Sequence, residues 1–159
     1  MTIYLALGAN RGDRAAQLRQ ALQALPGLGV RILRVSTLRA TAPVGPATGR
    51  GPFLNGVAQA QTRLPPQVLL RRLRGLERRQ GRHRGAPQAQ KIPRTLDLDV
   101  ILYGRARIRT PALTVPHPRF LQRRFVLEGM AELAPRLRAP GHARSMRQAL
   151  HSLGFHPKA

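Results

Sequence analysis

Cysteine and tryptophan are both absent from the 159-residue sequence. Without cysteine, neither a disulfide framework nor a thiolate metal site can form, so any metal must be bound by oxygen or imidazole ligands. Such ligands are typical of Mg, Mn or Ca sites. Long apolar runs are also missing: none approaches the roughly 20 residues of a membrane span, and the N-terminus lacks the features of an export signal. We therefore expect a cytoplasmic protein with no membrane partner.

Acidic residues are scarce, with six Asp and Glu against 28 Lys and Arg, for a formal net charge of +22. Such a charge favours polyanionic partners, including nucleotides and nucleic acids. Nearly all of it is arginine, and Lys91 and Lys158 are the only lysines. Together with the many Ala, Gly and Pro residues, this composition is typical of GC-rich codon usage, which scatters arginine over a surface. The charge alone therefore identifies no specific nucleic-acid partner.

The length is typical of one domain, and we expect a single domain over residues 1–159. Hydrophobic spacing predicts a strand over 2–7, a helix from Asp13 to Leu25, strands over 30–41 and 53–62, a helix from Pro66 that ends before Gly81, and a strand over 95–103. This β-α-β-β-α-β order predicts an α+β fold with a ferredoxin-like antiparallel sheet. A short strand near 105–109, a helix over about 125–133 and a helix from Ser145 to Gly154 are expected to follow.

Two of the six acids, Asp97 and Asp99, are two residues apart on the last predicted strand of this core. Because side chains alternate on a strand, both carboxylates project from one face, while Leu96, Leu98 and Val100 anchor the other face. Two anions so close together need a cation between them. A Mg site shared with substrate phosphates fits this pattern. The alternative is a salt-bridge network with surrounding arginines, which would serve structure alone.

Cationic side chains stand close to this acidic pair in the sequence. Arg94 directly precedes the strand, and Arg82 and Arg84 enter the loop that leads to it. Phosphoryl transfer depends on metal ions and cationic donors around the transferring group, which these residues can supply. Arg82 and Arg84 could instead be solvated charges at a helix C-terminus. His117, between two prolines, is placed to donate a hydrogen bond to a ligand.

Several spaced motifs together resemble the hydroxymethyldihydropterin pyrophosphokinase family over the whole length of the chain. The matching segments are Leu5–Asp13, Pro43–Pro46, Phe53–Asn55, Glu77–Arg84, Pro93–Asp99 and Val115–Arg119, followed by Arg123 and Phe125. The run Pro-Arg-Thr-Leu-Asp-Leu-Asp is highly specific. The resemblance implies a ferredoxin-like α+β fold with helices on both faces of the sheet. It also implies that a pterin hydroxyl attacks the β-phosphorus of ATP and releases AMP.

The resemblance further assigns the site residues. Asp97 and Asp99 match ligands of two Mg ions that bridge the ATP phosphates. Phosphate and nucleotide contacts are implied at these positions: Glu77, Arg82, Arg84, Arg94, His117 and Arg123. Of these, Arg82 and Arg94 would act with the two aspartates in catalysis.

The same resemblance places 6-hydroxymethyl-7,8-dihydropterin between Phe53 and Phe125, with Asn55, Thr41 and Val44 completing the pocket. With six aromatic residues in the chain, a flat heterocycle has few possible stacking partners. The alternative is that both phenylalanines are ordinary core residues.

The sequence departs from the family pattern at two places. Lys91 and Ile92 stand where the family commonly has an aromatic residue and a glycine, and Arg74 stands where it frequently has a polar amide. Three other functions stay open: a basic ferredoxin-like RNA-binding domain, an inactive homologue, and a kinase for a related pterin alcohol. RNA binding would leave Asp97 and Asp99 facing a polyanion. We expect a monomer that acts on small molecules.

Overall fold

The computed structural model describes residues 1–10, 12–41, 53–81 and 96–154. The main sheet contains β1 (Thr2–Ala9), β2 (Val30–Val35), β3 (Arg39–Thr41), β4 (Phe53–Thr62) and β5 (Asp97–Tyr103). The helices are α1 (Arg14–Ala24), α2 (Pro66–Gly81), α3 (Arg124–Leu133) and α4 (Met146–Ser152). Single turns of 3-10 helix lie at η1 (Leu25–Leu28) and η2 (Phe120–Gln122). A separate two-stranded sheet pairs β6 (Ile108–Arg109) with β7 (Thr114–Val115).

The strands of the main sheet follow the order β2-β4-β1-β5, and β3 pairs with β4. Every pairing is antiparallel. The two chain connections that carry α1 and α2 each skip one strand, which is the split arrangement of a ferredoxin-like fold. The predicted α+β, ferredoxin-like fold is therefore confirmed.

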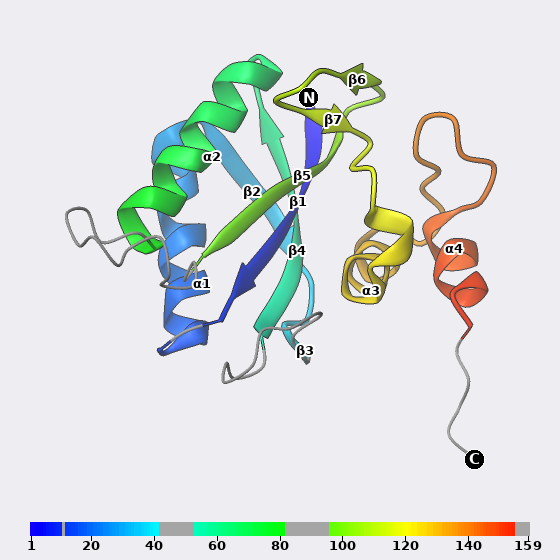
Figure 1. The fold of residues 1–159 in the computed structure, drawn as a ribbon, viewed down its shortest axis with the longest axis horizontal. Helices are drawn as coiled ribbons and strands as arrows, with labels where there is room; N and C mark the ends of the chain where they lie inside the picture. The colour runs from blue at the N-terminus through cyan, green and yellow to red at the C-terminus, as the bar shows by residue number, and fades with distance from the viewer. Residues whose placement is uncertain (11, 42–52, 82–95, 155–159) are drawn as a thin grey trace.

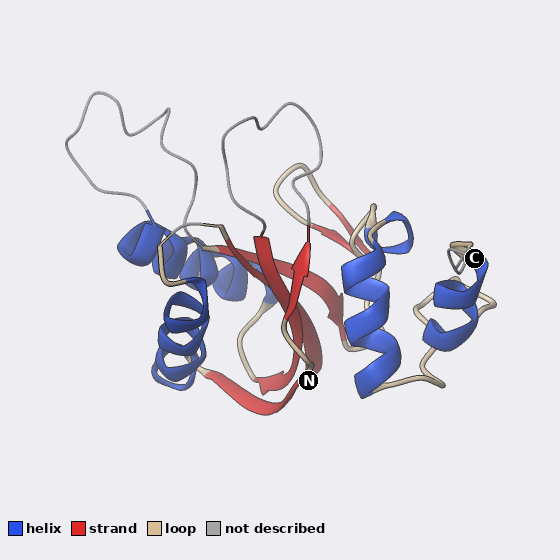
Figure 2. Cartoon of the chain, turned by 90° about the horizontal axis from the view of Figure 1, so that it is seen from below, coloured by secondary structure: helices blue, strands red, loops and turns tan. Residues whose placement is uncertain are grey.

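Helices cover both faces of the sheet, as Figures 1 and 2 show. On one face, Leu18 of α1 and Leu69 and Leu73 of α2 pack against Ile3 and Leu5 of β1. All of these side chains are fully buried. Burying a leucine or isoleucine side chain stabilises a fold by roughly 1.5–3 kcal/mol, so this face supplies much of the core.

The opposite face is covered by α3, with α4 packed beyond it (Figure 1). Val126, Leu127 and Met130 of α3 meet Tyr4 and Val57 of the sheet. Gly129 makes this contact close, because a Cβ added there would lie 2.5 Å from Cγ2 of Val57. The helix therefore rests directly on the strands. Its first turn lies near the last residues of β1 and the first residues of β5, where the candidate site is found.

Local signals account for most of the element boundaries. The Asp13 carboxylate accepts the Ala16 N–H at 3.0 Å and caps α1, as expected. Ser145 and Gln148 form a reciprocal capping box at α4. β4 has the predicted bounds, whereas α2 includes Gly81, which was expected to follow the helix.

The strand expected over 30–41 is wrong as a single element. It is divided into β2 and β3, and 36–38 leave the ladder. Ser36 explains the break, because its hydroxyl, at 2.8 Å, accepts the Val57 N–H that a strand carbonyl would otherwise accept. The short strand expected near 105–109 is reduced to Ile108–Arg109, and its partner is β7. Among the described residues, no helix is long and apolar enough to cross a bilayer.

Candidate functional site

A cavity of about 740 Å³ lies between the sheet and the chain that leads into α3. Its sheet side is formed by ends of β1, β3, β4 and β5, and its other side by η2 and the first turn of α3. The lining residues are Ala6, Leu7, Gly8, Thr41, Phe53, Asn55, Asp97, Asp99, Arg119, Gln122, Arg123, Arg124 and Phe125. Seven residues of the predicted site are therefore brought together from segments far apart in the sequence.

Asp97 and Asp99 occupy the cavity side of β5. In the sheet register, Asp97 is opposite Gly8 and Asp99 is opposite Ala6. Both aspartates are half-buried, while Leu98 and Val100 between and beyond them are buried in the core. The predicted division of this strand into an acidic face and an apolar face is thus observed. Across the cavity, Nη1 of Arg123 lies 3.5 Å from Oδ2 of Asp99.

A polar and aromatic wall lies beside the acidic pair. Asn55 is buried, and its side-chain amide donates to the Thr41 hydroxyl at 2.5 Å. Phe53 on β4 and Phe125 on α3 are both half-buried and line the cavity. Phe125 also packs partly against the core under α3, so it is shared between the core and the cavity.

Gly8 connects the two parts of the cavity. It pairs with Asn55 on one side and with Asp97 on the other. A Cβ at this position would lie 2.8 Å from Oδ1 of Asn55, so any side chain would crowd the amide. The glycine leaves a hollow between the amide and the carboxylates, which suits a flat group held next to a charged one.

His117 lies beyond the aspartates, in a neighbouring hollow lined also by Arg107, Arg109 and Thr114. Its Nδ1 accepts the Arg119 N–H at 3.1 Å, so the ring proton of the neutral form is on Nε2, where it can be donated. Burial lowers the pKa of His117, and Arg123 and Arg119 act in the same direction, while Asp99 opposes them. The ring is therefore a neutral donor near neutral pH.

Glu77 lies under the start of β5 and outside the main cavity. Its buried carboxylate accepts the Leu98 N–H at 3.1 Å with one oxygen and Nη1 of Arg74 at 2.7 Å with the other. Burial disfavours the guanidinium of Arg74, but the hydrogen bond and charge of Glu77 outweigh it and raise the Arg74 pKa. Asp99 and Asp97 add to this rise, so Arg74 is within electrostatic reach of the acidic pair.

Arg74 also lines a shallow apolar hollow between α2 and β6. Its other lining residues include Leu70, Arg71, Ile108 and Leu113. An apolar floor rimmed by arginines can take a base with attached phosphates. No role for Arg74 was predicted, because the contact with Glu77 that marks it is visible only in the structure.

Four predicted site residues lie outside the described residues: Val44, Arg82, Arg84 and Arg94. Their roles stay predictions. Six cavity residues had no predicted role: Ala6, Leu7, Gly8, Arg119, Gln122 and Arg124. The position of Gly8 opposite Asp97 could be found only from strand register.

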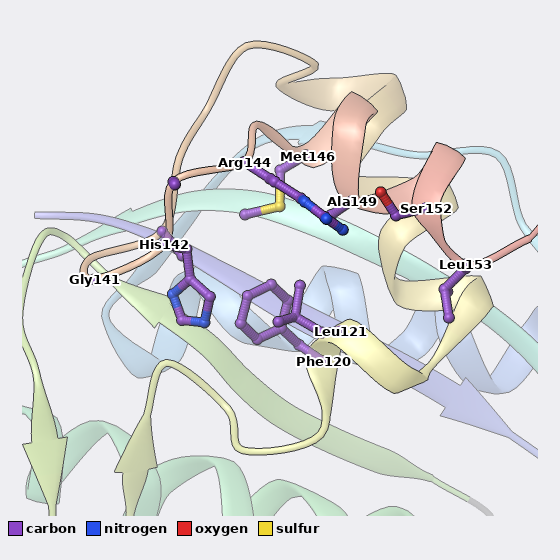
Figure 3. A pocket seen from close by; sticks show the side chains of 11 residues that line it. Phe120, Leu121, Gly141, His142, Arg144, Met146, Ala149, Ser152 and Leu153 are labelled. Carbon is purple, nitrogen blue, oxygen red and sulfur yellow. The ribbon is translucent and has the colours of Figure 1, made fainter.

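A further pocket, of about 440 Å³, lies between η2 and α4 and is shown in Figure 3. Phe120 and His142 meet there edge to face, with ring centroids 5.3 Å apart, and Met146 lies beside them. The described residues that line it include no carboxylate. Among the residues that the structure describes, this pocket therefore offers no carboxylate to a metal ion.

The donor set of the main cavity suits a hard cation. Among the described residues, no group of three or more His, Cys, Asp or Glu side chains could enclose a metal. Two carboxylates alone fit Mg²⁺, which usually keeps several waters and takes substrate phosphates as further ligands. A dedicated all-protein metal cage would require more ligands than these residues provide.

The chain is similar to known proteins over most of its length. Residues 4–135 match the family described as 7,8-dihydro-6-hydroxymethylpterin-pyrophosphokinase, or HPPK. The chain is 42% identical over 139 residues to 2-amino-4-hydroxy-6-hydroxymethyldihydropteridine pyrophosphokinase of Pseudomonas aeruginosa. This match covers 87% of this chain and 83% of that protein. It is 41% identical over 131 residues to the protein of the same name from Bacillus subtilis, covering 82% of this chain and 76% of that one.

Solved structures give the same fold. A structure of HPPK-DHPS in complex with substrates matches 95% of this chain with a TM-score of 0.71 at 12% identity. Wild-type HPPK-DHPS of Plasmodium falciparum matches 95% with a TM-score of 0.67 at 11% identity. This chain spans 43% of each of those longer chains.

Proposed function

Because the chain belongs to the 7,8-dihydro-6-hydroxymethylpterin-pyrophosphokinase family, we propose that it transfers pyrophosphate from ATP to 6-hydroxymethyl-7,8-dihydropterin in folate synthesis. The observation that carries this proposal is that Asp97 and Asp99 line the same cavity as Asn55, Phe53 and Phe125. One half of the cavity suits a metal-bound polyphosphate, and the other half suits a flat heterocycle with polar edges.

In this reaction the hydroxymethyl oxygen of the pterin bonds to the β-phosphorus of ATP. The bond between that phosphorus and the oxygen bridging to the α-phosphate breaks, and AMP leaves with the electron pair. The hydroxyl proton is lost to solvent, since among the described residues we assign no general base. Catalysis then consists of positioning and of stabilising the charge that spreads over the phosphate oxygens.

The pterin half is formed by two elements that approach each other. Phe53 and Phe125 would contact the ring faces, while Asn55 would hydrogen-bond the polar edge, with Thr41 holding the amide in place. Val44 is proposed to complete this pocket. A ligand that cannot hydrogen-bond Asn55 would leave a buried amide without a partner, which costs binding free energy. Asn55 is therefore selective for a ring with matching donors and acceptors.

The phosphate half is formed by Asp97 and Asp99, which would hold Mg²⁺, proposed as two ions. With Mg²⁺ held there, these two carboxylates would serve to neutralise charge on the substrate phosphates. Arg123 lines the cavity beside Asp99 and could donate to a phosphate oxygen bound there. Arg82 and Arg94 are proposed to act with it on the transferring group.

The nucleotide is proposed to extend from this half toward α2 and β7. The Nε2 proton of His117 can be donated to ribose or phosphate oxygen, and Arg84 is proposed to contact phosphate. Glu77 would act on the nucleotide indirectly, by fixing Arg74 at the edge of the apolar hollow.

We also propose that the chain works as one domain over 1–159 and as a monomer in the cytoplasm. The support for a single working chain is that residues of β1, β3, β4, β5 and α3 from the same chain line the cavity together.

The decisive experiment incubates the purified protein with ATP, Mg²⁺ and 6-hydroxymethyl-7,8-dihydropterin and quantifies AMP and pterin pyrophosphate by chromatography. Equal amounts of both products, formed only with Mg²⁺, are expected. Without either product, assays with related pterin alcohols would separate a different substrate from an inactive homologue.

A further inference from the structure

A group of charged side chains joins β3 to α3 outside the cavity. Nε of Arg39 lies 3.0 Å from Oε2 of Glu128, and Nη2 of Arg39 lies 3.1 Å from Oε2 of Glu132. Glu132 also accepts the Thr37 N–H and, at 2.7 Å, the Thr37 hydroxyl. We call Arg39, Glu128 and Glu132 the β3–α3 clamp.

The clamp links the two walls that would hold the pterin. β3 pairs only with β4 in the described sheet, and it carries Thr41, the partner of Asn55. α3 carries Phe125 one turn before Glu128. The position of β3 relative to α3 therefore sets the distance between the Thr41–Asn55 side of the cavity and its Phe125 side.

One of these carboxylates, that of Glu128, also contacts a residue of the cavity lining. Oε1 of Glu128 accepts from Nε of Arg124 at 2.8 Å, and Arg124 lines the cavity. The two oxygens of Glu128 therefore hold one arginine from the helix and one from the strand. The close approach of Gly129 to Val57 brings α3 near enough for both glutamates to reach β3.

The use of acids is also informative. The chain has six acidic residues, and two of them are used in this one contact. The side chains of Arg39, Glu128 and Glu132 are 31%, 26% and 35% exposed, so solvent screens their attraction. Exposed ion pairs add little to stability. Two of the few carboxylates are thus used in a contact that adds little to stability. A role in positioning β3 relative to α3 explains the contact better than a role in stability.

We propose that Arg39 is a positioning residue for pterin binding: it holds β3 against α3 and so fixes the width of the pterin pocket. The role rests on the proposed function, because the pocket is assigned through it. Arg39 does not line the cavity, so its effect is transmitted by β3 and by Glu128.

The test compares Arg39→Met with Arg34→Met. Arg34 also joins the sheet to α3, since its Nη1 donates to the Leu133 carbonyl at 2.9 Å, but it does so from β2 at the far end of the helix. Binding of 6-hydroxymethyl-7,8-dihydropterin is measured by calorimetry with Mg²⁺ and α,β-methylene-ATP. We expect Arg39→Met to weaken pterin binding about three- to fivefold, the most that exposed ion pairs can contribute. Arg34→Met should leave pterin affinity within about twofold of wild type, and both variants should bind the ATP analogue normally.

A conservative variant and salt provide a second readout. Arg39→Lys keeps the charge but cannot contact both carboxylates with a planar fork, so it should recover part of the lost affinity. The pterin is uncharged, so wild-type pterin affinity at saturating nucleotide should fall as NaCl screens the clamp, and the Arg39→Met variant should lose this dependence.

The outcomes separate the two proposals. Wild-type protein that binds pterin without turning it over would contradict the proposed reaction and leave the clamp standing. Equal weakening by Arg39→Met and Arg34→Met, or equal losses for pterin and nucleotide, would overturn the clamp alone. A wild-type protein that binds no pterin would overturn both.

Discussion

The two faces of the sheet are made from the same strands but do different work. Toward α1 and α2, β1 and β5 present Leu5, Leu7 and Leu98, which are almost completely buried. Toward α3, the same strands present Gly8, Asp97 and Asp99 to an open cavity. A single step along β5 therefore changes a side chain from core to candidate metal ligand.

The difference indicates how the site keeps its geometry. Polar groups around the cavity gain little from burial, so they depend on the apolar face behind them for their positions. Glu77 joins the two faces, because its buried carboxylate comes from α2 and binds the β5 backbone at Leu98, between the two aspartates. Substitutions on each face should consequently separate stability from turnover.

The largest effect is expected for Asp99→Ala. Loss of one of two carboxylates should lower turnover by at least about 10²–10³-fold, because charge on the transferring group loses its counter-ion. Stability should change by less than about 1 kcal/mol, since the 3.5 Å contact with Arg123 is partly exposed. Turnover is measured as AMP formation by chromatography, and stability is measured by thermal unfolding. Asp97→Ala should have the same effects as Asp99→Ala.

Asp13→Ala is the matched control, because it removes a carboxylate that caps α1 and does not line the cavity. It should cost about 1 kcal/mol of stability and leave turnover per folded molecule unchanged. Near wild-type turnover in either Asp97→Ala or Asp99→Ala would contradict the metal assignment.

Leu98→Ala should show the reverse pattern. The side chain is fully buried among α2 and β1, so its truncation should lower the free energy of unfolding by about 2–5 kcal/mol. The Leu98 N–H, which binds Glu77, remains in this variant. Turnover at low temperature should therefore stay within severalfold of wild type. A loss of turnover without a loss of stability would show that the faces are not separable.

Asn55→Ala tests the division within the cavity. Loss of a buried amide should raise the pterin KM about 10- to 100-fold, since it removes about 1.5–3 kcal/mol of hydrogen bonding, while the ATP KM changes little. Gln59→Ala is a control on the same strand, because that amide donates to Tyr4 and lies outside the cavity lining. Equal rises in both KM values would argue against Asn55 as a pterin ligand.

The fold was largely predictable because its signals are local. Spacing of leucines, the Asp13 and Ser145 caps, and alternation on β5 are all readable along the chain. The break at 36–38 was not, because it depends on a hydroxyl of Ser36 replacing a ladder carbonyl and on Glu132, 95 residues away, binding Thr37. Contacts of that range leave no pattern in the neighbouring sequence.

The site was predictable in part for the same reason. Asp97 and Asp99 stand out by spacing, and the resemblance to a known family located Asn55 and Phe125, which the structure brings into one cavity. Arg39 carries no such signal among 28 basic residues. Its significance comes from the helix that approaches it, and register and helix packing are decided by the assembled core.

The smallest effect is expected for His117, through pH. Burial lowers its pKa below the ordinary value, so between those two values the unfolded chain binds more protons than the folded one. Stability must then fall as pH decreases through about 6.5 toward the lower folded pKa, and it is retained above that window. His117→Gln, which cannot titrate, should lose less stability than wild type between pH 7.5 and 5.5. The difference in melting temperature should be about 1–2 °C, because the ring is only half-buried. If the melting temperatures of the two proteins changed equally between pH 7.5 and 5.5, His117 would instead be open to solvent in the folded state.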